Sequence, residues 1–258
     1  MATYLITGSS RGLGLELVTQ LAALPSAQVG RIFATTRSEP SAALTNLVDG
    51  SSGRVVRVEL DTCDKTSVTN ASTEVAKILH ADDTGLDVLI NNAGTMPVTP
   101  DGIETMDNLT ETFQANVTAT HHVIAAFLPL LRKGSQQKVF NISTTLGSMT
   151  MAPRYSIMPV PAYKVSKAAL NMLTVQYALS LEKEGFTFIT ISPGWLRTDM
   201  GNMFGIEADL PVAAGASAVL EAVHKYGKED NGKYYNIRVA GWEKNEGLNQ
   251  YDGLSPPW

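Results

Sequence analysis

The architecture of this chain is set near its start, by Thr3-Tyr4-Leu5-Ile6-Thr7 followed directly by Gly8-Ser9-Ser10-Arg11-Gly12-Leu13-Gly14. The first half is an apolar, β-rich run that predicts a buried strand, and a helix-like pattern of apolar residues begins at Leu13. The glycines at 8, 12 and 14 allow a tight turn and let the helix pack closely on the strand. A strand that passes through a glycine-rich turn into a helix is the first unit of an α/β fold.

Strand-like and helix-like segments alternate along the rest of the chain. The predicted strands are 3–7, 31–35, 54–60, 86–90, 138–142, 186–191 and 233–237. The intervening segments that are long enough for crossover helices are 13–24, 66–80, 106–132, 162–184 and 212–226. Several strands are continuously apolar, which is typical of strands covered on both faces. The pattern predicts an α/β fold, a single doubly wound Rossmann-fold domain over 1–258, with a seven-stranded, mostly parallel sheet and helices on both faces.

The composition narrows the possible functions. The chain has 258 residues, with 20 Lys and Arg against 25 Asp and Glu, so its net charge of −5 does not favour nucleic acid as a partner. Cys63 is the only cysteine, which excludes an internal disulfide and cysteine-rich metal sites, and we expect it to be buried. No signal peptide or membrane-spanning apolar run is evident, so we expect a cytoplasmic protein without a membrane partner.

The glycine-rich turn predicts a nucleotide site. The free N–H groups and positive dipole end of the following helix can hold phosphates, and the expected contacts are Gly8, Ser10, Arg11, Gly12, Leu13 and Gly14. An NAD site usually places an acid about 20 positions further on, to bind the ribose 2′-hydroxyl. Here the second strand ends in Ala34-Thr35-Thr36-Arg37-Ser38, without an acid. Because guanidinium groups bind phosphate through paired hydrogen bonds, Arg37 and Arg11 favour the 2′-phosphate of NADPH.

Two residues in the second half of the chain form a candidate proton-transfer pair. Tyr163 and Lys167 are four apart at the start of a helical pattern, so both project from one helix face. A free tyrosine has a pKa of about 10, and a nearby ammonium group is expected to lower it. The pair can then give a proton to a carbonyl oxygen while a hydride reaches the carbonyl carbon.

Taken together, these motifs resemble the short-chain dehydrogenase/reductase family over essentially the whole chain. The matching elements, in the family's order and at about its spacing, are Thr7 to Gly14, Asp61, Asn91-Asn92-Ala93-Gly94, Asn116, Ser143-Thr144, Tyr163-x-x-x-Lys167 and Pro193-Gly194. A narrower resemblance, to the carbonyl reductase branch that includes sniffer, the C-factor proteins and fungal ketoreductases, rests on the segment Pro193 to Gly201 and the tail from Tyr251-Asp252-Gly253 to Pro257-Trp258.

The resemblance implies a role for each matching residue. Tyr163 is the expected general acid or base, Lys167 is expected to bind the nicotinamide ribose and tune Tyr163, and Asn116 to support a water that links Lys167 to solvent. Asp61 and Thr62 match the adenine contact. The residues expected beside the cofactor or at its nicotinamide end are Asn91, Asn92, Ala93, Gly94, Pro193, Gly194 and Thr198. Asn91, Ala93 and Gly94 are also expected to brace the sheet.

The substrate-orienting hydroxyl departs from the family pattern. That residue is usually a serine followed three positions later by glycine, and here Thr144 stands three positions before Gly147. The step from Thr144 to Tyr163 is 19 residues, several more than usual. Threonine offers the same hydroxyl as serine, so Thr144 and Ser143 both remain candidates. The extra residues near 145–162 and the segment 199–211 are expected to be substrate loops, whose methionines predict an adaptable apolar wall.

The leading interpretation is an NADPH-dependent enzyme that reduces the ketone or aldehyde carbonyl of an apolar small molecule, of the kind met in secondary metabolism. Two alternatives are an imine or iminium reductase or related cyclisation enzyme, and a non-catalytic NADPH-binding sensor. The apolar faces of 106–132 and 162–184, which form a dimer four-helix bundle in the family, imply a homodimer or homotetramer. His121 and His122 face different directions on a helix and lack further ligands nearby, so no metal site is expected.

Overall fold

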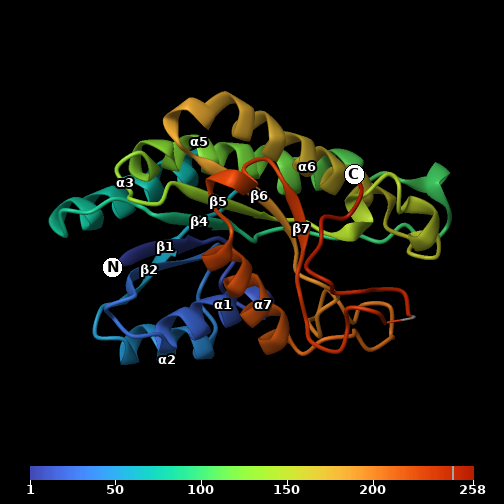
Figure 1. The fold of residues 1–258 in the computed structure, drawn as a ribbon, viewed down its shortest axis with the longest axis horizontal. Coiled ribbons are helices and arrows are strands. Elements are labelled where there is room, and N and C mark those ends of the chain that lie inside the picture. Colours follow the sequence, from blue (N-terminus) through green and yellow to red (C-terminus); the bar gives the residue numbers. More distant parts are fainter. Residues whose placement is uncertain (246) are drawn as a thin grey trace.

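A seven-stranded sheet in which every neighbouring pair is parallel forms the centre of the molecule. The structure is a computed structural model, and it describes residues 1–245 and 247–258. The strand order is β3-β2-β1-β4-β5-β6-β7 (Figure 1), with β1 at Ala2–Ile6, β2 at Val29–Thr36, β3 at Val55–Glu59, β4 at Val88–Asn91, β5 at Lys138–Ile142, β6 at Thr187–Ser192 and β7 at Tyr234–Asn236. The order reverses between β1 and β4, as in a doubly wound sheet, and the predicted fold is confirmed.

Helices cover both faces of this sheet (Figure 1). One face carries α3 (Lys65–Ala81), α5 (Ala119–Leu131) and α6 (Pro161–Leu181), and the other carries α1 (Gly12–Ala23), α2 (Ala42–Gly50) and α7 (Val212–Lys225). Each layer buries its own apolar cluster. Along β1, Leu5 belongs to the cluster under α3 and α5, whereas Ile6 belongs to the cluster over α1 and α7. Successive side chains of a strand point to opposite faces, so a strand covered on both sides is apolar throughout.

The predicted helix 106–132 is interrupted. A short helix, α4 (Leu109–Phe113), leads into a π-helical turn, η2 (Gln114–Thr118), and α5 follows that turn. Turns of this kind are rare and frequently lie at functional sites. Asn116 lies within this one and is buried. The turn contains neither glycine nor proline, so its residues do not mark an interruption of the predicted helix.

One helix, α2, was missing from the predicted elements. Its N-terminus is capped by Ser41, whose Oγ atom accepts a hydrogen bond from the Leu44 N–H at 3.3 Å. Only Leu44 is fully buried, while Leu47 and Val48 are half-buried. The apolar pattern is therefore too short to stand out. The remaining short helical turns are η1 (Ile103–Thr105), η3 (Thr145–Gly147), η4 (Ala152–Tyr155), η5 (Glu182–Glu184) and η6 (Lys228–Asp230).

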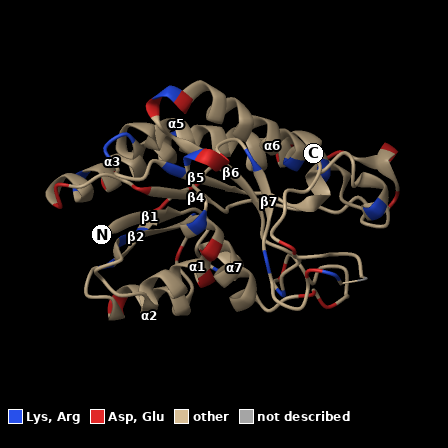
Figure 2. Cartoon of the chain, in the orientation of Figure 1, with Lys and Arg blue, Asp and Glu red and all other residues tan. Residues whose placement is uncertain are grey.

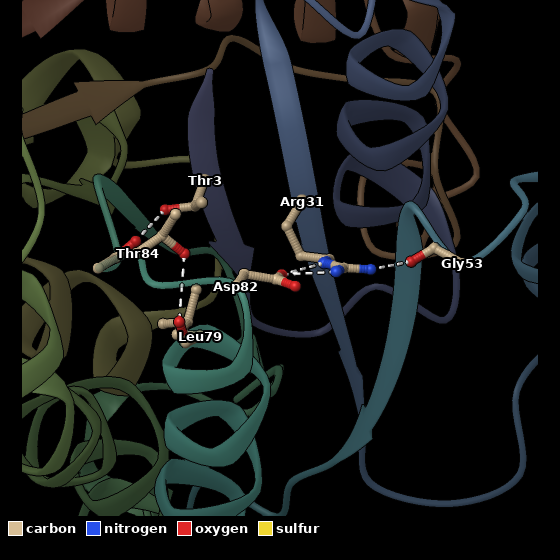
Figure 3. A network of polar contacts seen from close by, with 7 residues as sticks. Thr3, Arg31, Gly53, Leu79, Asp82 and Thr84 are labelled. Atoms are coloured by element: carbon tan, nitrogen blue, oxygen red, sulfur yellow. Dashed lines mark hydrogen bonds and ion pairs between the residues drawn. The ribbon is translucent and has the colours of Figure 1, made fainter.

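Polar contacts hold the edge of the sheet where the strands begin (Figure 3). Arg31 on β2 donates through Nε to Asp82, which follows α3, at 3.0 Å, and through Nη1 to the Gly53 carbonyl oxygen at 2.5 Å. Thr3 on β1 donates to the Gly85 carbonyl oxygen at 2.6 Å. These contacts join β1 and β2 to the segments that enter β3 and β4. They lie at the opposite edge from the glycine-rich turn and have a structural role.

Charged residues of both signs are interspersed over the helices and loops (Figure 2), in keeping with the small net charge of −5. Among the residues that the structure describes, no helix combines the length and the apolar character needed to cross a membrane.

Candidate active site

The glycine-rich turn after β1 is packed too closely to hold side chains. Gly8 has a φ of +71°, and a Cβ atom built on it would lie 3.1 Å from the Ala93 Cα atom. A Cβ atom on Gly14, in the first turn of α1, would lie 2.2 Å from the Gly8 carbonyl oxygen. The start of α1 is therefore pressed against the end of β1. Because Gly8 and Gly14 carry no side chains, a ligand at the carboxyl edge of the sheet can approach the backbone of the turn.

Thr7 ties the end of β4 to the end of β1. Its Oγ1 atom accepts hydrogen bonds from the backbone N–H groups of Asn92 and Ala93, at 2.9 and 3.0 Å. The Asn92 side chain donates in return to the carbonyl oxygen of Thr7 at 2.9 Å. Asn91 was expected beside the cofactor, but its side chain is buried in the sheet and donates to Asn141 on β5 at 2.8 Å. Asn91 therefore braces the sheet and does not line the cavity.

A cavity of about 760 Å³ opens along this carboxyl edge. Its wall brings together most of the residues predicted from the sequence, namely Gly8, Ser10, Arg11, Gly12, Leu13, Arg37, Asp61, Thr62, Asn92, Ala93, Gly94, Ser143, Thr144, Tyr163, Lys167, Pro193, Gly194 and Thr198. Three predicted residues, Gly14, Asn91 and Asn116, are not part of the wall. The volume falls within the usual range for sites that bind small molecules and cofactors.

Tyr163 and Lys167 share the first two turns of α6, which starts at Pro161, and both side chains are buried in the cavity wall. The Lys167 Nζ atom lies 5.6 Å from the centre of the Tyr163 ring and donates to the Ile142 carbonyl oxygen at 2.7 Å. Burial raises the pKa of Tyr163 and lowers the pKa of Lys167 to about 8. The tyrosine pKa is therefore raised, and not lowered as expected from the nearby ammonium, because burial has the larger effect.

Asn116 supports this pair from the π-helical turn. Its Oδ1 atom accepts from the Thr95 N–H at 2.8 Å, and its Nδ2 atom donates to the Thr95 carbonyl oxygen at 2.9 Å and to Ser166 Oγ at 2.9 Å. A Cβ atom on Gly94 would lie 3.0 Å from Asn116 Oδ1 and 3.7 Å from Lys167 Nζ. Asn116 and Lys167 thus flank the same glycine, and a side chain there would separate them.

The two candidate hydroxyl groups have different surroundings. Ser143 is 2% exposed, and its Oγ atom donates to Asn171 Oδ1 on α6 at 2.6 Å. Thr144 is half-buried, and its Oγ1 atom accepts from the Leu146 N–H at 3.3 Å, so its proton remains free. Both residues line the cavity. The proton of Ser143 is committed to Asn171, which leaves Thr144 as the better hydrogen-bond donor toward a ligand.

The opposite end of the cavity carries Arg37 and Asp61. Arg37 is exposed at the end of β2, while Arg11 in the glycine turn forms an exposed ion pair with Asp199, with Nη1 and Oδ2 2.6 Å apart. Cys63 was expected to be buried, but it is exposed and lines this end. The chain turns outward after β3, and the Cys63 N–H bonds to Asp61 Oδ1 at 2.9 Å. Arg37, unlike Arg11, forms no ion pair among the residues that the structure describes.

The end of the cavity beyond Tyr163, here called the tail end, was largely missed by sequence reasoning. It is lined by Tyr155, Trp195, Asn236 and the tail residues Leu248, Asn249, Gln250 and Tyr251. The tail contributes to the sequence analysis only through its resemblance to a family branch. Its position beside the site could have been inferred, because the tail leaves the last strand of a parallel sheet at the carboxyl edge and must run back past the site.

The methionines of the two predicted substrate loops form only part of this wall. Met158 and Met200 line the cavity, as expected. Met149, by contrast, is 75% exposed, and Met203 is 43% exposed. Their loops form short helical turns and bends, which point some of the apolar side chains outward.

Comparisons with known proteins agree with this geometry. Residues 2–207 match the family model described as short chain dehydrogenase. A short-chain dehydrogenase of Neurospora crassa is 30% identical over 263 residues, covering 99% of this chain and 88% of the relative. The structure of an NADPH-bound carbonyl reductase from chicken fatty liver has 28% identity and a TM-score of 0.84, covering 100% of this chain and 94% of that one. The carbonyl reductase Sniffer of D. melanogaster has 29% identity and a TM-score of 0.84, with both chains fully covered.

Proposed function

The chain belongs to the short-chain dehydrogenase/reductase family, and from this premise we propose that it uses NADPH to reduce the ketone or aldehyde carbonyl of an apolar small molecule. The observation that carries the proposal is one continuous cavity, with the glycine-rich turn and Arg37 toward one end and the buried pair Tyr163 and Lys167 toward the other. We treat 1–258 as one cofactor-binding domain whose segments near 145–162 and 199–211 contribute to the substrate pocket.

The residues present fit a dinucleotide that carries a 2′-phosphate. Gly8 and Gly14 leave a cradle that a Cβ atom would fill, so phosphate groups can approach the backbone of the turn. Arg37 supplies a guanidinium for the 2′-phosphate, and Asp61 lies in the same end of the cavity to bind the adenine edge. Structural relatives with NADPH bound support this assignment. Pro193, Gly194 and Thr198 would hold the nicotinamide, with Thr198 close to the glycine-rich turn, since its Cγ2 atom lies 3.3 Å from the Cβ position of Gly12.

In the proposed reaction, bound NADPH supplies a hydride to the carbonyl carbon. The raised pKa of Tyr163 keeps its phenol protonated at neutral pH, so the residue is ready to donate a proton to the carbonyl oxygen. Lys167, when protonated, stabilises the phenolate that remains. The free hydroxyl proton of Thr144 can bond the same oxygen and orient it. Asn116 would keep Lys167 in place through the segment around Gly94.

An apolar substrate is supported by the lining of the cavity near Tyr163. Met96, Leu146, Met158 and Leu248 contribute apolar side chains, and Trp195 contributes an aromatic one. Such a lining binds through removal of apolar surface from water, while a few polar groups fix the orientation of the ligand.

A Tyr163→Phe variant tests the reaction. We expect kcat with a panel of aliphatic and aromatic ketones and aldehydes to fall by about 10²–10⁴-fold, because the proton donor is lost, while NADPH still binds. The matched control is Tyr177→Phe on the same helix, since the Tyr177 hydroxyl pairs with His121 at 2.7 Å and lies outside the cavity. Undiminished turnover in Tyr163→Phe would refute the assignment, and turnover confined to imines would replace carbonyl reduction by imine reduction.

We also propose a homodimer or homotetramer. On α6, Val165, Met172 and Leu179 are 48%, 59% and 64% exposed, and they recur every seven residues along one helix face. Burying this stripe against a second copy would remove its apolar surface from water.

A cytoplasmic location remains part of the proposal, and fluorescence microscopy of the tagged chain would test it.

A further inference from the structure

The cavity wall at its tail end depends on one phenol. Tyr251 is 2% exposed, and its hydroxyl donates to Asp209 Oδ2 and accepts a hydrogen bond from the Trp195 N–H at 3.1 Å. The tail therefore meets two nearby stretches, the one after β6 and the end of the 199–211 loop, at a single oxygen atom.

The same ring packs against Gly194. A Cβ atom on Gly194, which has a φ of +83°, would lie 3.0 Å from Tyr251 Cε1 and 3.1 Å from both Ile237 Cδ1 and Leu210 Cδ1. Gly194 thus adopts a left-handed conformation that suits glycine, in a space bounded by the ring of Tyr251. The ring of Tyr251 therefore packs against Gly194, and its hydroxyl bonds to the next residue, Trp195.

Further hydrogen bonds hold Asp209, the acceptor of the Tyr251 hydroxyl, in place. Its carboxylate also accepts a hydrogen bond from Asn249 Nδ2 at 2.8 Å. Backbone bonds hold the carboxylate near Trp195, since the Leu210 N–H donates to the Trp195 carbonyl oxygen at 3.0 Å. Burial, with help from Asp209, raises the pKa of Tyr251, so the phenol keeps its proton and remains a donor.

We propose that Tyr251 and Asp209 are a positioning pair for the reduction: together they fix Gly194 and Trp195, the segment at the nicotinamide end of the cavity. The inference rests on the proposed function, because it concerns where that function places its cofactor and substrate. Neither residue transfers a proton or a hydride. Their contribution is geometric, and misplacement of a reacting group by about 1 Å can cost about 100-fold in rate.

A Tyr251→Phe variant tests the pair. It keeps the ring against Gly194 and removes the bonds to Asp209 and Trp195. We expect the single-turnover rate of NADPH oxidation, at saturating NADPH and ketone, to fall by about tenfold or more. A purely structural role would lower the melting temperature and leave this rate unchanged at 25 °C, because a protein with about 5–15 kcal/mol of stability stays folded after losing two hydrogen bonds.

The matched control is Tyr226→Phe. Tyr226 is also buried, its hydroxyl donates to the nearby tail carbonyl of Gly253 at 3.4 Å, and it does not line the cavity. We expect its turnover rate to match the wild type. A Tyr251→Phe rate equal to that of Tyr226→Phe would overturn the inference.

An Asp209→Asn variant provides a second, independent test of the pair if Tyr251→Phe fails to fold. It should slow turnover in the same direction but less, since an amide oxygen can still accept one bond. The double variant should be no slower than Tyr251→Phe alone, because both changes act through one contact; fully additive losses would contradict the pair. The proposed function is judged separately, on turnover by the wild type and its loss in Tyr163→Phe.

Discussion

At the scale of single residues, burial determines how the reactive pair is protonated. Tyr163 and Lys167 lie in the same cavity wall, yet burial pushes their pKa values in opposite directions, up for the phenol and down to about 8 for the amine. Each shift favours the neutral form. The phenol of Tyr163 is therefore protonated near physiological pH, and the pKa of the Lys167 amine, about 8, lies close to that range.

We expect kcat/KM for NADPH to decrease as the pH rises through about 8. Below that value Lys167 is charged and stabilises the phenolate that forms when Tyr163 gives up its proton; above it, the amine is neutral and this stabilisation is lost. The pH profile of kcat/KM reports groups of the free enzyme. A Lys167→Arg variant, which stays charged, should be less active but lose the inflection. A rate that increases through pH 8 would contradict this role.

Substitutions of the two neighbouring hydroxyl residues should affect different quantities: kcat for Thr144 and the stability of the fold for Ser143. Thr144→Val removes the donor aimed at the carbonyl, and we expect kcat to fall about 10²–10³-fold with little change in melting temperature. Ser143→Ala leaves Asn171 without its buried partner, and we expect a loss of about 1–3 kcal/mol of stability with a smaller effect on kcat. Steady-state kinetics and thermal unfolding of both variants check this. The reverse pattern would make Ser143 the orienting residue.

Sequence analysis predicted many of the residues that line the cavity, but it could not determine which of these two hydroxyl groups orients the substrate. Tyr163 and Lys167 are identifiable because helical spacing alone puts them on one face. Ser143 and Thr144 are adjacent in the chain, and what distinguishes them is Asn171, whose proximity depends on how α6 packs against β5. Cys63 was misplaced for a similar reason, since its exposure depends on the outward turn after β3.

At the scale of elements, close packing between α1 and β1 shapes the phosphate end of the cavity. Strand, turn and helix were predictable because the apolar pattern and the glycines agree. The π-helical turn at Gln114–Thr118 and helix α2 were not, because the first contains no glycine or proline to mark it and the second buries only Leu44 completely. Sequence patterns thus indicated the elements with a long apolar face and missed those without a distinct local signal.

A Gly14→Ala variant should lose both stability and cofactor binding. The new Cβ atom would lie 2.2 Å from the Gly8 carbonyl oxygen, so backbone must move, and we expect a loss of about 1–3 kcal/mol. Gly50→Ala is the control, because nothing lies within 4 Å of its Cβ position at the end of α2. Thermal unfolding with and without NADPH measures both effects. Equal behaviour of the two variants would show that the turn tolerates a side chain.

At the scale of the whole molecule, the two ends of the parallel strands have different roles, one structural and one in forming the cavity. The edge where the strands begin is held by contacts such as those of Arg31 with Asp82 and Gly53 (Figure 3). The carboxyl edge carries the cavity. Helices shield both faces, and the apolar stripe of Val165, Met172 and Leu179 on α6 is exposed in the single chain.

A Met172→Glu variant tests the proposed homo-oligomer. We expect the wild type to have a mass of at least two chains of 27.7 kDa by light scattering, and the variant to shift toward one. A buried, unpaired charge is costly at an interface. Ala43→Glu, on the exposed face of α2, should leave the mass unchanged. A single-chain mass for the wild type would refute the assembly.

The late position of the tail end has a consequence for how the site comes into being during synthesis. The residues that we assign to the cofactor all precede Asp199, whereas Asn236 and Leu248 to Tyr251 are synthesised later. At about 5–20 residues per second, the two parts of the cavity are made several seconds apart. A nascent chain therefore carries its nucleotide-binding residues before it has the tail residues that complete the cavity wall and hold Gly194 and Trp195.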